Sequence, residues 1–248
     1  MGFYNEDELT TMPAVLVILL FMALVLAFLL HDKPRRVRQI PTMVIAVALL
    51  VLEGIKQRWN ALGGFDAYML PLHYCTLFVI LIPLAELCGE RLSRFFRPAA
   101  AAMCFIVSMA MYSYPSGILG IACEHFGIGF EATHTFVFHH LLVLYLFLTV
   151  ALGLCKPRLR DAITVGAAGV AYAMVGIPCA YIFQENYCNY LSSAIPFIED
   201  LRLAYGQVVH AVVITLFITI GAMVGTLIYI AIHRLIALCF FRNATFDE

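Results

Sequence analysis

The stretch PAVLVILLFMALVLAFLL at residues 13–30 contains no charged side chain. A helix needs about 20 predominantly apolar residues to cross the hydrocarbon core of a bilayer, so this stretch predicts a membrane-spanning helix. Acidic residues precede it, Glu6, Asp7 and Glu8, at a place where a cleavable signal peptide would carry positive charge. We therefore expect residues 13–30 to be retained as the first transmembrane helix.

The rest of the chain is similarly apolar. Of its 248 residues, 63% are hydrophobic and 12% are charged, whereas soluble domains are about half apolar and about a quarter charged. Charged and Pro- or Gly-rich breaks separate apolar runs, none of which alternates as the strands of a membrane barrel would. The sequence predicts one all-α domain, residues 1–248, with seven transmembrane helices at residues 13–30, 40–59, 68–87, 98–119, 134–154, 162–183 and 205–232.

Lysine and arginine are unevenly divided between the two sets of loops that this topology creates. Of 15 such residues, 12 fall on one side and only Lys56, Arg58 and Arg202 fall on the other. Because positive charge is concentrated in cytosolic loops, we expect the N-terminus outside and the C-terminus in the cytosol. The protein is then a multi-pass protein of the plasma membrane or of an endomembrane.

The charge pattern also limits the possible partners. The net charge is -1, and no run of five or more like charges occurs, so nucleic acid is not an expected partner. Seven spans with short loops leave no room for a separate soluble domain. Any function is therefore expected inside the bundle or at its mouths.

Polar side chains gather in the outer half of the predicted bundle, and the inner half contains almost none. Ionisable groups are costly at membrane depth and mark reactive sites. Cys75 and His139 are expected at depths of about 10 Å and about 9 Å, from a rise of roughly 1.5 Å per residue. The two residues would therefore lie in one layer, as a reactive chamber that opens outward would need. The other polar residues of this layer are Glu53, Lys56, His73, Tyr112, His134, His140, Gln184, Asn186 and His210.

Each of these residues also has a structural interpretation. A membrane cysteine such as Cys75 is usually a small apolar filler. Histidines near helix ends, such as His134 and His140, often bond to headgroups or to a neighbouring carbonyl. Glu53 and Lys56 are three residues apart on one helix face and can neutralise each other. The shared depth of the set favours a functional interpretation more than any single residue does.

A cysteine and a histidine together suggest a nucleophile. The thiolate is the reactive form of cysteine, and a nearby imidazole generates it by taking the thiol proton. Cys75 and His139 have the right types but lie 64 positions apart. No local catalytic signature surrounds either residue, so the spacing alone is weak evidence.

The sequence around Cys75 resembles a known family. The stretch LPLHYC at residues 70–75, followed by an apolar run, is similar to a motif of the YwaF family of integral membrane proteins, which includes an animal ether-phospholipid acyltransferase. Glu53 with Lys56, and the stretches FHHL at 138–141, ENY at 185–187 and NYL at 189–191, also resemble that family. The similarity extends from about the second to the seventh predicted helix.

The resemblance implies a transacylase that moves a fatty acyl chain from a phospholipid to a lysophospholipid. Cys75 would be the acyl-accepting thiol and His139 the base. His140 stands where relatives usually have glycine, so the choice between the two imidazoles stays open. His73 would orient a headgroup or the thiolate, and Asn186 or Tyr112 would donate to an oxyanion. No cofactor and no metal is implied, and the expected partners are membrane phospholipids and lysophospholipids.

Two other functions remain open. Seven-helix lipid hydrolases hold zinc with several histidines, and His73, His134, His139 and His210 would be the ligands here, although no HxxxH or HExxH spacing occurs in a span. A non-enzymatic receptor or transporter is the other alternative, although receptor motifs and an inverted repeat are lacking. The oligomeric state stays open.

Two cysteines fall in predicted outer loops. If the outer compartment is oxidising, Cys123 and Cys188 are expected to form a disulfide. The alternative is a pair of free loop thiols.

Overall fold

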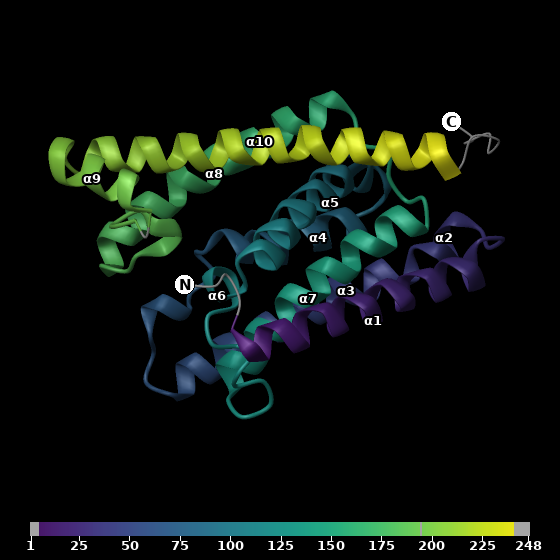
Figure 1. The fold of residues 1–248 in the computed structure, drawn as a ribbon, viewed down its shortest axis with the longest axis horizontal. Helices are drawn as coiled ribbons and strands as arrows, with labels where there is room; N and C mark the ends of the chain where they lie inside the picture. Colours follow the sequence, from purple (N-terminus) through teal and green to yellow (C-terminus); the bar gives the residue numbers. More distant parts are fainter. Residues whose placement is uncertain (1–4, 194, 241–248) are drawn as a thin grey trace.

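The chain folds as a bundle of α-helices in a computed structural model that describes residues 5–193 and 195–240 (Figure 1). Across these ranges, six helical stretches are long and apolar enough to cross a membrane. They are α1 (Glu6–Leu30), α2 with α3 (Arg35–Arg38 and Ile40–Leu62), α5 (Glu90–Ser113), α7 (Phe130–Ala151), α8 (Leu159–Phe183) and α10 (Gln207–Phe240). The prediction of an all-helical, multi-pass membrane protein is confirmed.

The remaining helices are short. Three are α-helices: α4 (Phe78–Leu87), α6 (Pro115–Leu119) and α9 (Pro196–Tyr205). Three are 3₁₀ turns: η1 (Ala67–Met69), η2 (Tyr74–Leu77) and η3 (Tyr187–Asn189). These short elements join the long helices and include the segment that carries Cys75.

Two predicted spans differ from the observed helices. The run at residues 68–87 is not one helix, because it is interrupted before η2 and continues as an apolar helical stretch only from Tyr74 to Leu87. The run at residues 98–119 is divided at Tyr114, which has an extended φ of -148°. Tyr114 precedes Pro115, and a residue before proline is driven out of the helical region. Helix α5 also begins earlier than predicted, at Glu90.

Helix α7 lies at the centre of one half of the bundle, where it packs against α1, α3 and α5. Its side chains are largely buried. Helix α1 is largely exposed along its apolar length. An exposed apolar helix is the expected outer layer of a protein whose solvent is lipid.

Helices α8 and α10 lie side by side and also contact α5 (Figure 1). Glycines allow this close approach. A Cβ atom at Gly166 would lie 2.8 Å from Met223 Sδ, and a Cβ atom at Gly225 would lie 2.6 Å from Ile106 Cγ1. Small residues at such contacts let membrane helices pack through direct van der Waals contact.

The two ends of the bundle carry different elements. Helix α1 begins at the end where α6 and α9 lie, and α10 ends on the side of α2 (Figure 1). The basic residues Arg35, Arg36 and Arg38 belong to α2. We call the end that carries α2 the basic end and the opposite one the α9 end.

A buried ion pair near the basic end corrects the expectation that the inner half is nearly free of polar groups. Arg97, assigned to a loop from the sequence, lies within α5 and donates from Nε to Glu86 Oε1 at 2.7 Å. Tyr145 of α7 donates to the same oxygen at 2.8 Å, and Thr42 of α3 donates to Glu86 Oε2 at 2.7 Å. One carboxylate therefore connects α3, α4, α5 and α7.

Candidate functional site

Cys75 lies in an irregular segment that interrupts the predicted third helix. Residues 70–73 form a loop, and Cys75 follows within η2, directly before α4. Cys75 is half-buried and packs against the main apolar core, to which Phe138 and Leu142 of α7 also belong. Non-helical backbone within a membrane protein must have its polar groups satisfied by the protein itself.

Side chains of α8 and η3, together with that of Thr76, form hydrogen bonds with the main-chain carbonyls of this loop. The Tyr172 hydroxyl of α8 donates to the His73 carbonyl at 2.8 Å and lies 3.3 Å from the Pro71 carbonyl. Thr76 Oγ1 donates to the same His73 carbonyl at 2.6 Å. The Cys188 thiol of η3 lies 3.4 Å from the Leu72 carbonyl. The residues leading to Cys75 are therefore fixed by α8 and η3.

A set of aromatic side chains encloses the same segment. The hydroxyls of Tyr74 and Tyr190 lie 2.8 Å apart. Tyr190 is fully buried, and a Cβ atom at Gly176 would lie 3.1 Å from its ring, so Gly176 provides the space for it. On the other side, the His73 ring lies edge-on to Tyr68 and Tyr187.

Asn186 and His210, two members of the predicted polar layer, support the conformation of η3. Asn186 donates to the Ser192 carbonyl at 3.1 Å and accepts from the Leu191 amide at 2.9 Å, so both ends of its side chain are used within the loop. His210 Nε2 lies 2.9 Å from the Asn189 carbonyl, which connects α10 to η3. Both residues act on the segment that contacts the Cys75 motif.

Glu53 and Lys56 form the ion pair that their spacing allowed, with Nζ 3.0 Å from Oε1. Gln57 donates to Glu53 Oε1 at 2.7 Å and to the Met69 carbonyl at 2.8 Å. Helix α3 is thereby connected to η1, just before the Cys75 motif. His134 of α7 is buried, and its ring packs on Phe130 and Phe138.

The three histidines of α7 point in different directions. Successive residues of an α-helix are rotated by about 100°, so His134 and His139 are about 140° apart and His139 and His140 are about 100° apart. His140 faces Tyr112 of α5, with 6.4 Å between the ring centroids. In residues 5–193 and 195–240, no three His, Cys, Asp or Glu side chains gather into a group that could hold a metal ion. The four histidines that the zinc hydrolase would need are not assembled.

His139 and His140 make the same kind of contact through their Nδ1 atoms. Their Nδ1 atoms lie 2.8 Å and 2.7 Å from the carbonyls of Thr135 and Phe136, one turn earlier in α7. A carbonyl only accepts, so each Nδ1 carries the hydrogen and each Nε2 keeps its lone pair. Both Nε2 atoms are buried without a hydrogen-bond partner. They are therefore available to accept a proton from a substrate or a nucleophile.

Cys75 and His139 are not joined directly. The polar contact of His139 is with Thr135, and its ring packs on Phe138. Over the part of the chain that the structure describes, no hydrogen bond links the Cys75 thiol to an imidazole. Cys75 packs against the apolar core to which Phe138 belongs, and Phe138 in turn packs on the His139 ring.

The predicted disulfide between Cys123 and Cys188 is wrong. Both are free cysteines. Cys123 packs with Met12 and Met111, whereas Cys188 packs with Tyr187 and Tyr190 in a separate cluster. Each thiol occupies an apolar environment of its own.

Sequence reasoning missed Tyr172, which holds the Cys75 motif, and noted Tyr190 only as part of the NYL stretch. Tyr172 lies within an otherwise small and apolar helix, in the stretch AAGVAYAMVG at 167–176. A single hydroxyl among small residues was the available signal. Its partners could not be identified, because they lie about a hundred positions earlier in the chain.

Comparison with known proteins places the chain in a family. No curated protein and no solved structure gives a match. The model of the TMEM164 family matches residues 3–241, nearly the whole length, so the chain belongs to the TMEM164 family.

Proposed function

We propose that this protein is a membrane lipid acyltransferase in which the Cys75 thiol accepts a fatty acyl chain from a phospholipid and passes it to a lysophospholipid. The observation that carries the proposal is the irregular PLHYC segment at residues 71–75. Its carbonyls are bonded by Tyr172, Thr76 and Cys188, while Cys75 itself is half-buried. Interrupting a membrane helix costs free energy, because its main-chain groups need other hydrogen-bond partners. Several side chains that fix such a break serve to position the residue it carries.

The first half of the reaction transfers the acyl chain to sulfur. An imidazole takes the Cys75 proton, and the thiolate attacks the ester carbonyl of the donor phospholipid. The ester C–O bond breaks, and the departing lysophospholipid oxygen takes the proton back from the imidazolium. The products of this half are a Cys75 thioester and a lysophospholipid.

The second half reverses the roles. The hydroxyl of an acceptor lysophospholipid gives its proton to the imidazole and attacks the thioester carbonyl. The C–S bond breaks, and the thiolate recovers the proton. A site shielded from water favours the lipid hydroxyl over hydrolysis.

His139 is the base in this proposal, as the resemblance implies. Support comes from its Nε2, which has a free lone pair and no partner. Its hydrogen bond with the thiol would form when substrate binds, since catalytic hydrogen bonds are often long before the substrate complex forms. His140 has the same electronic arrangement, and the unpartnered Nε2 of His134 lies on the same helix. All three therefore belong in the test.

We further propose seven crossings, with the N-terminus outside and the C-terminus in the cytosol. The helical stretch Tyr74–Leu87 would be the third crossing, completed by the loop that precedes it. Support comes from α1 and α10, which begin and end at opposite ends of the bundle (Figure 1). Membrane-impermeant labelling of epitope tags at the two termini in intact cells tests this arrangement: only the N-terminal tag should be labelled.

The activity is tested with purified protein in nanodiscs that contain a phospholipid with a labelled acyl chain and an unlabelled lysophospholipid. Wild-type protein should move the label to the acceptor, and Cys75→Ala should abolish the transfer. Cys179→Ala, another partly buried cysteine of the bundle, is the matched control and should retain it. The variants His134→Ala, His139→Ala and His140→Ala then identify the base, with the largest loss expected for His139.

The products distinguish the proposal from hydrolysis. Label found in the acceptor phospholipid supports acyl transfer, whereas label released only as free fatty acid supports a lipid hydrolase. Equal activity of wild-type protein and Cys75→Ala would exclude the proposed nucleophile.

A further inference from the structure

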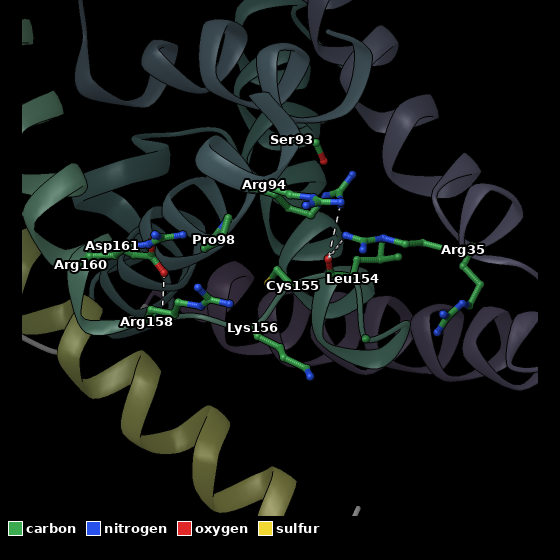
Figure 2. A pocket seen from close by; sticks show the side chains of 13 residues that line it. Arg35, Ser93, Arg94, Pro98, Leu154, Cys155, Lys156, Arg158, Arg160 and Asp161 are labelled. Carbon is green, nitrogen blue, oxygen red and sulfur yellow. Dashed lines mark hydrogen bonds between the residues drawn. The ribbon is translucent and has the colours of Figure 1, made fainter. Parts of the chain in front are cut away.

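A cavity of about 980 Å³ opens at the basic end (Figure 2). Four segments line it: α2, the beginning of α5, the loop that joins α7 to α8, and the first turn of α8. Seven lining side chains are Arg or Lys, and one, Asp161, is a carboxylate. So many like charges around one cavity repel one another unless an anion lies between them.

The arginines are held in place by main-chain carbonyls. Arg38 donates to the Leu152 carbonyl at 3.0 Å, and Arg35 and Arg97 donate to the Leu154 carbonyl at 3.4 Å. Gly153 lies between those two carbonyls with a φ of +61°, a left-handed conformation that favours glycine. The turn after α7 therefore points the carbonyls of Leu152 and Leu154 at arginines from other helices.

In the part of the chain that the structure describes, carboxylates do not balance the positive charge of the lining arginines. Glu86 pairs with the lining residue Arg97, and Glu90 pairs with Arg94 at an exposed site. Asp161 accepts from the Arg158 main-chain nitrogen at 2.6 Å, which holds the start of α8 (Figure 2). Among the described side chains, six lining arginines thus face three carboxylates, two of which lie outside the lining.

Two hydrogen-bond donors of the cavity are buried without a partner. They are Arg38 Nε and the hydroxyl of Ser93, a residue only 7% exposed. A buried polar atom without a partner costs free energy unless a ligand or water satisfies it. Their place in the lining of a strongly basic cavity indicates an acceptor that is itself an anion.

We propose that this cavity binds a phosphate monoester, carried either by an anionic lipid headgroup or by a small soluble ester. Guanidinium groups match phosphate oxygens through paired N–H donors, and a phosphate monoester brings enough charge to offset several arginines. Basic pockets between transmembrane helices on the cytoplasmic side are suited to such headgroups. This site goes beyond the proposed acyl transfer and is separate from it.

The test measures binding and not turnover. Protein carrying Cys75→Ala, reconstituted in phosphatidylcholine nanodiscs, is titrated with short-chain phosphatidate, with short-chain phosphatidylcholine and with glycerol 3-phosphate. The Cys75→Ala background keeps acyl transfer out of the measurement, so the result does not depend on the proposed function. Phosphatidate should bind saturably and phosphatidylcholine should not.

Variants locate the binding. Arg38→Gln should weaken phosphatidate binding roughly tenfold or more, because a hydrogen bond between charged groups is lost. Arg158→Gln and Arg160→Gln should also weaken it, and because both residues are exposed, these variants keep the test valid if Arg38→Gln does not fold. Arg91→Gln is the matched control, since Arg91 is an exposed arginine of the same end outside the lining.

The outcomes separate the sources of the phosphate. Tight phosphatidate binding with weak glycerol 3-phosphate binding identifies a lipid ligand. Equal binding of both, lost in the same variants, identifies a soluble ester. The proposal is overturned if neither ligand binds, or if Arg91→Gln weakens binding as much as the cavity variants do.

Discussion

Glu86 and Arg97 form a bidentate ion pair near the basic end of the bundle. Arg97 Nε and Nη2 lie 2.7 Å and 2.9 Å from the two carboxylate oxygens. Their side chains are 0% and 2% exposed. With Tyr145 and Thr42 as further donors, both oxygens of Glu86 are fully used. A charge pair so completely enclosed couples the helices that supply its members.

Removing one member of that pair should destabilise the protein. Glu86→Gln leaves the Arg97 charge buried without a counter-charge, which costs about 3–5 kcal/mol. Thermal unfolding in detergent should show a large fall in the melting temperature. Glu90→Gln, which breaks an exposed pair with Arg94, should change it little. A Glu86→Gln variant as stable as Glu90→Gln would contradict this account of the helix packing.

The hydroxyl of Tyr172 should control the position of Cys75. Tyr172→Phe removes the donor to the His73 carbonyl. A neutral hydrogen bond is worth about 0.5–1.5 kcal/mol, so the rate of acyl transfer should fall between about twofold and about tenfold. The rate of Cys75 alkylation, followed by mass spectrometry, should change as well. Tyr181→Phe, an exposed tyrosine on the same helix, should leave both rates unchanged.

Two glycines of α10 should respond differently to the same substitution. Gly225→Ala places a Cβ atom 2.6 Å from Ile106 Cγ1, whereas at Gly221 nothing lies within 4 Å. Overpacking costs about 1–3 kcal/mol, and alanine is favoured over glycine in an open helix position by about 1 kcal/mol. Melting temperatures should therefore fall for Gly225→Ala and stay equal or rise for Gly221→Ala. The opposite order would mean that α5 and α10 are not in close contact.

The thiols of Cys123 and Cys188 should remain unpaired. Their side chains belong to separate apolar clusters, so oxidation would require the clusters to rearrange. Alkylation of unfolded protein without a reductant, followed by peptide mapping, should recover both cysteines in the modified form. A peptide pair linked through these two residues would show that the two clusters lie closer together than the structure places them.

Much of the helical architecture could be predicted from the sequence because membrane helices are encoded locally. The run at residues 13–30 falls within α1, and the run at 134–154 overlaps α7 over most of its length, since each needs only continuous apolar side chains. The run at 68–87 was equally apolar, but hydropathy does not report where backbone hydrogen bonds are replaced by side chains. The break before Cys75 depends on Tyr172, whose position relative to Pro71 is fixed only by the fold.

Polar contacts were predicted well only where the partners are close in sequence. Glu53 and Lys56 lie one turn apart, and their ion pair was foreseen. Arg97 is expected in a basic loop from the sequence, because other arginines surround it. Its partner Glu86, a carboxylate at the end of an apolar run, was the signal for a buried ion pair. The tautomers of His139 and His140 followed only from carbonyl positions in α7.

The most direct test of the central claim is the chemical identity of the acylated residue. Purified protein is incubated with a phospholipid bearing a labelled acyl chain, quenched without acceptor, and divided into samples with and without neutral hydroxylamine. The account predicts one acyl group on Cys75, found by peptide mapping and removed by hydroxylamine as expected for a thioester. Label that persists in Cys75→Ala, or that lies on another residue, would contradict it.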